Sequence, residues 1–146
     1  MTKVLRNPFF NDPFALVWTA FKNLYPDKDC DCWFDAVDDP DDNDGHYGWT
    51  QWNDDGTITV AVDIGLTLAD AVEIFAHELA HVAAGSDADH GAAWECAFDA
   101  IHAEYDRIGY ELYDKHSTAK CIDAKALKGN SAENPESLGN TRVSDT

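Results

Sequence analysis

The sequence predicts a single α+β domain, and three observations support this fold class. An amphipathic helical pattern comes first, alternating strand patterns occupy the middle of the chain, and two further helical patterns follow. The 146 residues suit one domain. Hydrophobic residues make up 45% of the chain, which is enough for a core of its own.

A first helix is predicted over residues 13–25. Asp12 is a favourable N-cap residue and Pro13 suits the first helical position. Pro26 then ends the pattern, because the residue before a proline disfavours the helical conformation. The apolar positions that recur at helical spacing are Phe14, Val17, Trp18, Phe21, Leu24 and Tyr25.

Three strands are predicted next, over residues 30–37, 46–52 and 57–63. The second and third are joined by a plausible hairpin loop, Asn53-Asp54-Asp55-Gly56. Alternation in the third strand predicts a sheet with one better-buried face. In the first strand, the residues expected to share a face are Cys30, Cys32, Phe34 and Ala36.

Two helices are predicted after the strands. Thr67 and Asp70 resemble a capping box, and they open a helix that should end at Gly85. Its expected core stripe is Leu68, Val72, Phe75, Leu79 and Val82 or Ala83. The last helix should cover residues 91–108 and stop at Gly109; it carries Trp94, Phe98, Ile101 and Tyr105. We therefore expect one domain over residues 1–118 and a mobile tail over 119–146.

The charge excludes several classes of partner. With 28 acidic and 10 basic side chains the net charge is −18, so neither nucleic acid nor an anionic membrane surface is an expected partner. No apolar run approaches the roughly 20 residues of a transmembrane helix, and no signal peptide is apparent. We expect an intracellular, cytoplasmic protein. There are two interpretations of the acidic charge. It would attract basic peptides by electrostatic steering, or it serves solubility alone.

The segment His77-Glu78-Leu79-Ala80-His81 is the clearest chemical signal. Residues four apart share a helix face, so both imidazoles can reach one metal ion while Glu78 faces a water bound to that ion. A catalytic zinc site needs a third protein ligand. His90 is the preferred candidate, with Asp87 and Asp89 as alternative ligands or partners of a histidine N–H.

The segments HELAH and, nine residues after His81, HGxxW (from His90 to Trp94) together resemble the SprT-like and related zincin metallopeptidases. The resemblance covers about residues 57–108. It implies a small zincin-like domain, in which an active-site helix and a second helix carry the ligands of one catalytic Zn²⁺. By this resemblance, substrate would extend along an edge strand, here residues 57–63. DNA-directed members have basic surfaces or an added zinc ribbon, and this chain has neither; the metzincin spacing is also absent.

We therefore expect a zinc-dependent metallopeptidase that acts on a peptide or protein substrate. His77, His81 and His90 would bind the metal, and Glu78 would act as general base. The alternative is an acidic interaction module, such as an inhibitor or a DNA mimic, with a structural zinc site. A deformylase-like amidase lacks the expected Gly-rich and Cys-bearing segments.

Three groups of residues carry weaker signals. The four cysteines are expected to be free thiols, and Cys30 and Cys32 are interpreted as small buried residues in preference to ligands of a second metal. The acidic run 38–45 is interpreted as a solvated loop, because it does not fit the EF-hand calcium template. Three side chains could stabilise an oxyanion, although the sequence assigns the role to none of them: His102, Tyr105 and Tyr110.

Overall fold

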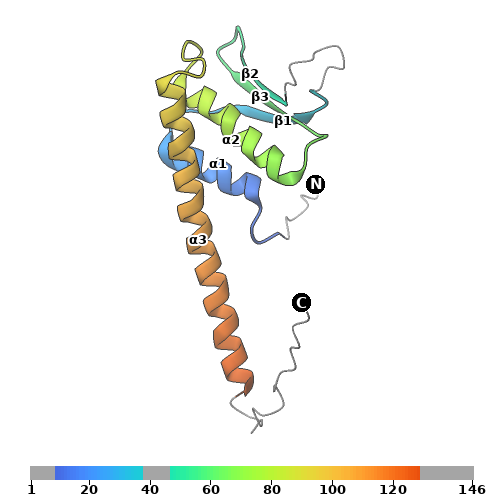
Figure 1. The fold of residues 1–146 in the computed structure, drawn as a ribbon, viewed down its shortest axis with the longest axis vertical. Coiled ribbons are helices and arrows are strands. Elements are labelled where there is room, and N and C mark those ends of the chain that lie inside the picture. Colours follow the sequence, from blue (N-terminus) through green and yellow to red (C-terminus); the bar gives the residue numbers. More distant parts are fainter. Residues whose placement is uncertain (1–8, 38–46, 129–146) are drawn as a thin grey trace, which may run out of the picture. The chain divides into compact units, whose positions relative to one another are not determined.

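The computed structural model describes residues 9–37 and 47–128, with side chains as far as residue 116. It confirms the α+β class, with three helices and one three-stranded sheet in these residues (Figure 1). In chain order the elements are α1 (Pro13–Leu24), β1 (Asp31–Asp35), β2 (Gly48–Trp52), β3 (Ile58–Asp63), α2 (Leu68–Ala84) and α3 (Ala92–Lys128). Residues up to Tyr110 form one compact unit, and those from Glu111 form another.

Helix α1 follows the sequence prediction to within one residue. The Asp12 carboxylate accepts hydrogen bonds from the backbone N–H groups of Phe14 and Ala15, at 3.0 and 3.3 Å. These bonds satisfy donors that have no partner inside the helix. Val17, Ala20 and Phe21 are buried, so the predicted apolar face does point into the core.

The sheet has the order β1-β3-β2, with β1 parallel and β2 antiparallel to β3. The hairpin between β2 and β3 confirms the predicted loop, since Gly56 N–H donates to the Asn53 carbonyl at 3.0 Å. The placement of strand 57–63 at the sheet edge is wrong, because β1 pairs with the side of β3 that β2 leaves free. Val60, Ala61 and Val62 are buried in succession in this central strand.

Helices α1 and α2 cover one face of this sheet (Figure 1). Phe14 of α1 contacts Phe34 of β1 and Phe75 of α2, with ring centroids 5.2 and 6.0 Å apart. Strand β1 is exposed along its whole length. The interpretation of Cys30 and Cys32 as small buried residues is therefore wrong for Cys32, which is exposed, while Cys30 is half-buried.

Helix α2 begins and ends as predicted. The Thr67 hydroxyl accepts a hydrogen bond from Asp70 N–H at 3.2 Å, and Gly85 ends the helix with a φ of 99°. Phe75, Leu79 and Val82 are buried as expected, against β2, β3 and α1. The expectation that Leu68 belongs to this stripe is wrong, because its side chain is 63% exposed.

The predicted stop of the last helix at Gly109 is wrong, because α3 continues to Lys128. One glycine costs a helix only about 1 kcal/mol relative to alanine, and good helix formers such as Glu111 and Lys115 follow it. The 118/119 boundary falls inside this helix. The acidic run 38–45 lies outside the described residues, and so does the part of the proposed tail from residue 129 onward.

Candidate metal centre

Three histidines meet at one end of helix α2. His77 and His81 lie one turn apart on α2, and His90 lies in the turn between α2 and α3. The His90 Nε2 atom is 3.1 Å from Nε2 of His77 and 3.2 Å from Nε2 of His81. Nitrogen ligands of a tetrahedral zinc ion stand about 3.3 Å apart, given Zn–N bonds of 2.0–2.1 Å. The three side chains predicted as ligands therefore fit a single metal ion.

Two successive turns bring His90 over α2. Ala88 N–H donates to the Gly85 carbonyl at 3.2 Å, and Gly91 N–H donates to the Ala88 carbonyl at 2.9 Å. Asp89 takes a positive φ of 46°, which aspartate tolerates better than most residues. The reversal between the helices is therefore tight enough to place the third imidazole on the face that carries the first two.

Trp94, on the first turn of α3, holds the three imidazole rings from one side. Its indole N–H donates to the His77 carbonyl at 3.2 Å. Its ring centroid lies 4.7, 4.8 and 5.7 Å from those of His77, His90 and His81, respectively. Phe98 stacks on Trp94 with ring centroids 5.0 Å apart and also lies 6.1 Å from the His77 ring. Trp94 packs against the core as the sequence indicates, and it also limits the rotamers of the cluster.

The surroundings of His77 and His81 favour neutral imidazoles. Burial, followed by the charges of His81 and His90, lowers the pKa of His77 to about 4, although Glu73 opposes the shift. Burial and His90 also lower the pKa of His81, against the effect of Asp89. Neutral imidazole is the form that binds metal, so protons compete little for these two side chains near pH 7.

Glu78 is a buried carboxylate beside the histidines, with 6% of its surface exposed. The Thr50 hydroxyl, on β2, donates to Glu78 Oε2 at 2.6 Å. A Cβ on Gly48 would lie 3.0 Å from Glu78 Oε1 and 2.6 Å from Ile74 Cγ2, so glycine is needed where β2 passes α2. Thr50 and Gly48 are site residues that the sequence analysis missed.

The histidines and Glu78 share one cleft of about 390 Å³ between β2, α2 and the α2–α3 turn. Its lining residues are Tyr47, Gly48, Trp49, Thr50, Trp52, Ile74, His77, Glu78, His81, Ser86, Asp89 and His90. Of the alternative ligands, Asp89 lines this cleft and Asp87 does not. In the part of the chain that the structure describes, one group of three or more potential ligands could hold a metal ion, and it consists of the three histidines.

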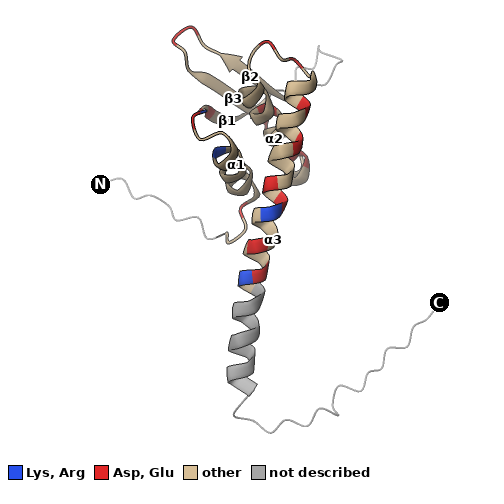
Figure 2. Ribbon diagram, turned by 90° about the vertical axis from the view of Figure 1, so that its left-hand side faces the viewer, with Lys and Arg blue, Asp and Glu red and all other residues tan. Residues whose placement is uncertain are grey.

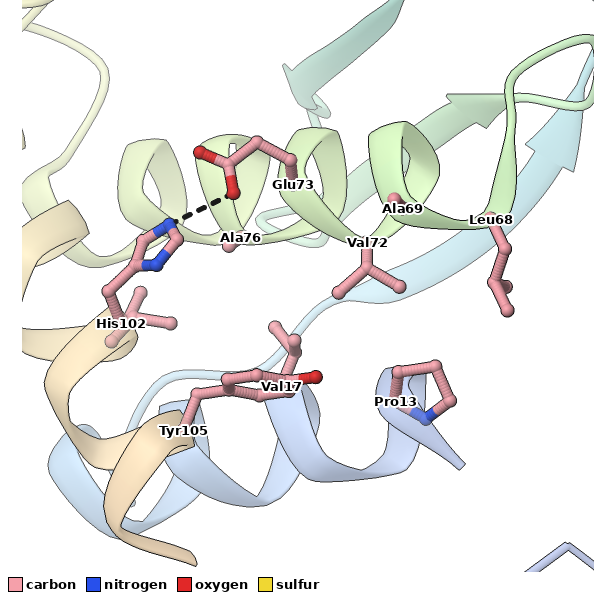
Figure 3. Close-up of a pocket in the computed structure, with 10 residues that line it drawn as sticks. Pro13, Val17, Leu68, Ala69, Val72, Glu73, Ala76, His102 and Tyr105 are labelled. Carbon is pink, nitrogen blue, oxygen red and sulfur yellow. Dashed lines mark ion pairs between the residues drawn. The ribbon is translucent and has the colours of Figure 1, made fainter. Parts of the chain in front are cut away.

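The suggested oxyanion donors are not brought to this cleft. His102 and Tyr105 line a different hollow of about 350 Å³ between α1, α2 and α3 (Figure 3). His102 Nε2 there lies 3.2 Å from a Glu73 oxygen, at one end of a largely apolar lining. Tyr110 is 72% exposed. Tyr47 is the one tyrosine among the residues that line the histidine cleft.

Comparison of the chain with protein-family models, curated proteins and solved structures gives no match. The SprT-like resemblance therefore stays a prediction that depends on the motif and on the geometry of this cleft.

Acidic positions outnumber basic ones along the described chain (Figure 2). Within the described residues, no helix is long and apolar enough to cross a membrane.

Proposed function

We propose that the protein is a zinc-dependent metallopeptidase with a zincin-like domain. The observation that carries the proposal is the meeting of three imidazole nitrogens with a buried carboxylate, Glu78, in one open cleft. A structural zinc site is normally closed by four protein ligands, whereas a catalytic site has three and leaves a position open. Three histidines at the wall of a cleft are typical of the catalytic kind.

Different residues would bind the zinc ion and transfer the proton. His77, His81 and His90 would hold the zinc ion, which polarises a carbonyl and lowers the pKa of a water molecule. Glu78 would accept the proton from the attacking water and deliver it to the leaving amine. The Thr50 hydroxyl orients that carboxylate, because it donates to Oε2 at 2.6 Å.

Strand β2 supports a peptide substrate over a small amide. It borders the cleft through Gly48, Thr50 and Trp52 and pairs with β3 along one edge. Among the described strands, nothing pairs with its other edge. An extended peptide can add to such an edge through main-chain hydrogen bonds. The net charge of −18 favours basic peptides as one class of substrate.

The decisive experiment compares wild type with Glu78→Gln. Both proteins should bind about one zinc ion at the histidine cluster, because Glu78 is not a ligand. The wild type should cleave an unfolded protein or a basic peptide library, and the variant should lose at least about a hundredfold in kcat/KM. His90→Ala should lose most of the zinc. Metal content is measured by mass spectrometry and cleavage by peptide sequencing.

Two results would contradict the proposal. The first is wild-type protein that binds no metal when purified without chelator. The second is cleavage that Glu78→Gln leaves unchanged, since that activity would belong to a contaminant. Bound zinc without any cleavage, together with Glu78→Gln binding a partner as tightly as wild type, would favour the acidic interaction module.

A further inference from the structure

We propose that Cys30 and Cys32 form a second metal site, a thiolate pair for a thiophilic divalent ion such as zinc or cadmium. Their Sγ atoms lie 3.7 Å apart at the start of β1. Residues two apart on a strand point to the same face, which explains why the thiols meet. This site is separate from the histidine cleft, because neither cysteine lines that cleft.

The distance between the sulfurs is that of two reduced thiols, and it also matches the spacing of two sulfurs on one metal ion. A disulfide needs the two sulfurs at about 2.05 Å, far inside the 3.7 Å observed. Two thiolates on one tetrahedral zinc ion, each with a Zn–S bond of about 2.3 Å, stand about 3.8 Å apart. The cysteines can therefore take up an ion with little movement of either side chain.

The two thiols of the pair differ in how easily they ionise. The hydrogen bond between the sulfurs lowers the pKa of Cys32 and raises that of Cys30. A divalent ion would bind both sulfurs as thiolates, and the proton of each thiol passes to solvent. Two sulfur–metal bonds form, two S–H bonds break, and no oxidant is required.

The surroundings admit a cation. Cys32 is exposed and Cys30 is half-buried, so an ion can approach from solvent. Asp29 and Asp31 add negative charge close to Cys30, where they raise its pKa and attract cations. Both thiols also line a hollow of about 330 Å³ with Phe14, Trp18, Trp33, Phe34 and other residues. Water would complete the coordination on the open side.

The test is titration of the reduced full-length protein with Cd²⁺, followed by the ultraviolet charge-transfer band of thiolate-bound cadmium. The histidine site has only nitrogen ligands, so it does not contribute to this band. In wild type, the band should reach its full intensity when each Cys30–Cys32 pair has bound one cadmium ion. Cys30→Ser and Cys32→Ser should each lose it. Cys96→Ser is the matched control, because Cys96 is an exposed free thiol outside the pair.

The proposal stands only if wild type and Cys96→Ser show the band while both other serine variants lack it. A band retained by either Cys30→Ser or Cys32→Ser overturns the paired site, and so does the absence of a band in wild type. Circular dichroism shows whether each variant is folded; Cys32 is exposed, so its replacement should leave the fold unchanged. Cleavage activity is not part of the readout, so this result and that for the metallopeptidase are independent.

Discussion

Glu78 depends on a residue from a distant part of the chain. Its carboxylate is buried at 6% exposure, and burial of a charge is costly unless hydrogen bonds replace the lost water. Thr50 supplies one such bond from β2, 28 residues earlier in the sequence. The side chain proposed to move the proton is thus held in place by the sheet, whereas the proposed metal ligands are not.

Replacing Thr50 by valine tests this dependence. Valine keeps the shape and removes the donor, so we expect a loss of about 1.5–3 kcal/mol in the free energy of unfolding, the usual range for a hydrogen bond to a charged group. Peptidase activity should fall as well, while zinc binding should not change. Urea denaturation measures the first effect. Thr50→Ser keeps the hydroxyl and serves as the control; equal losses in both variants would contradict the hydrogen-bond explanation.

The lowered pKa of His77 predicts how the metal-free protein responds to acid. The imidazole titrates at about 4 in the folded state and near 6.5 in an unfolded chain. Between these values the unfolded chain binds more protons, so stability falls as the pH falls from about 7 to about 4. The urea midpoint of chelator-treated protein should therefore be lower at pH 5 than at pH 7. His77→Gln should reduce this difference between the urea midpoints at pH 5 and pH 7. A difference that the substitution leaves unchanged would contradict a role of His77 in the pH dependence.

At the scale of elements, the sequence predicts what local chemistry determines. The caps Asp12 and Thr67 are visible in the sequence, and both helices begin where these residues predict. His77 and His81 could be paired because helix geometry fixes residues four apart. His90 could be added because only eight residues separate it from His81. Each of these inferences needs only short-range geometry.

Long-range pairing could not be predicted in the same way. No local pattern says that β1 pairs with β3, so the central position of β3 was missed. For the same reason, Thr50 gave no sign in the sequence that it would meet Glu78. Helix α3 passes Gly109 because its neighbours outweigh one weak residue, a balance that the presence of a glycine alone does not reveal.

The packing of β2 against α2 can be tested at two glycines. Gly48→Ala should destabilise the protein by about 1–3 kcal/mol, because its Cβ would meet Ile74 at 2.6 Å and strand backbone at 3.0 Å. Gly109→Ala is the matched control, since nothing lies within 4 Å of a Cβ there. In a helix that change should stabilise by about 0.5–1 kcal/mol. Thermal unfolding of both variants measures the two changes in stability. Equal shifts of the melting temperature would contradict the predicted close packing at Gly48.

At the scale of the whole molecule, the proposed zinc ion joins α2 to the turn that leads into α3. An ion that binds only the folded state raises its stability, by about 2.7 kcal/mol at a hundredfold excess over Kd. Chelation should therefore lower the melting temperature, and added zinc should restore it. In His90→Ala the effect of chelation should be much smaller. A melting temperature that chelator leaves unchanged in wild type would contradict a folded-state metal site.

The proposed site has two parts, the histidine cluster and the Glu78–Thr50 pair. They differ in how far apart their residues lie along the chain. All three histidines fall within residues 77–90, so the loops that an ion must close are short and cost little entropy. Glu78 reaches its partner Thr50 only when β2 is docked on α2. Local opening of the β2–β3 hairpin would therefore abolish catalysis without releasing the bound zinc ion. We expect bound zinc to be a poor measure of active protein, and hydrogen exchange in β2 to be a better one.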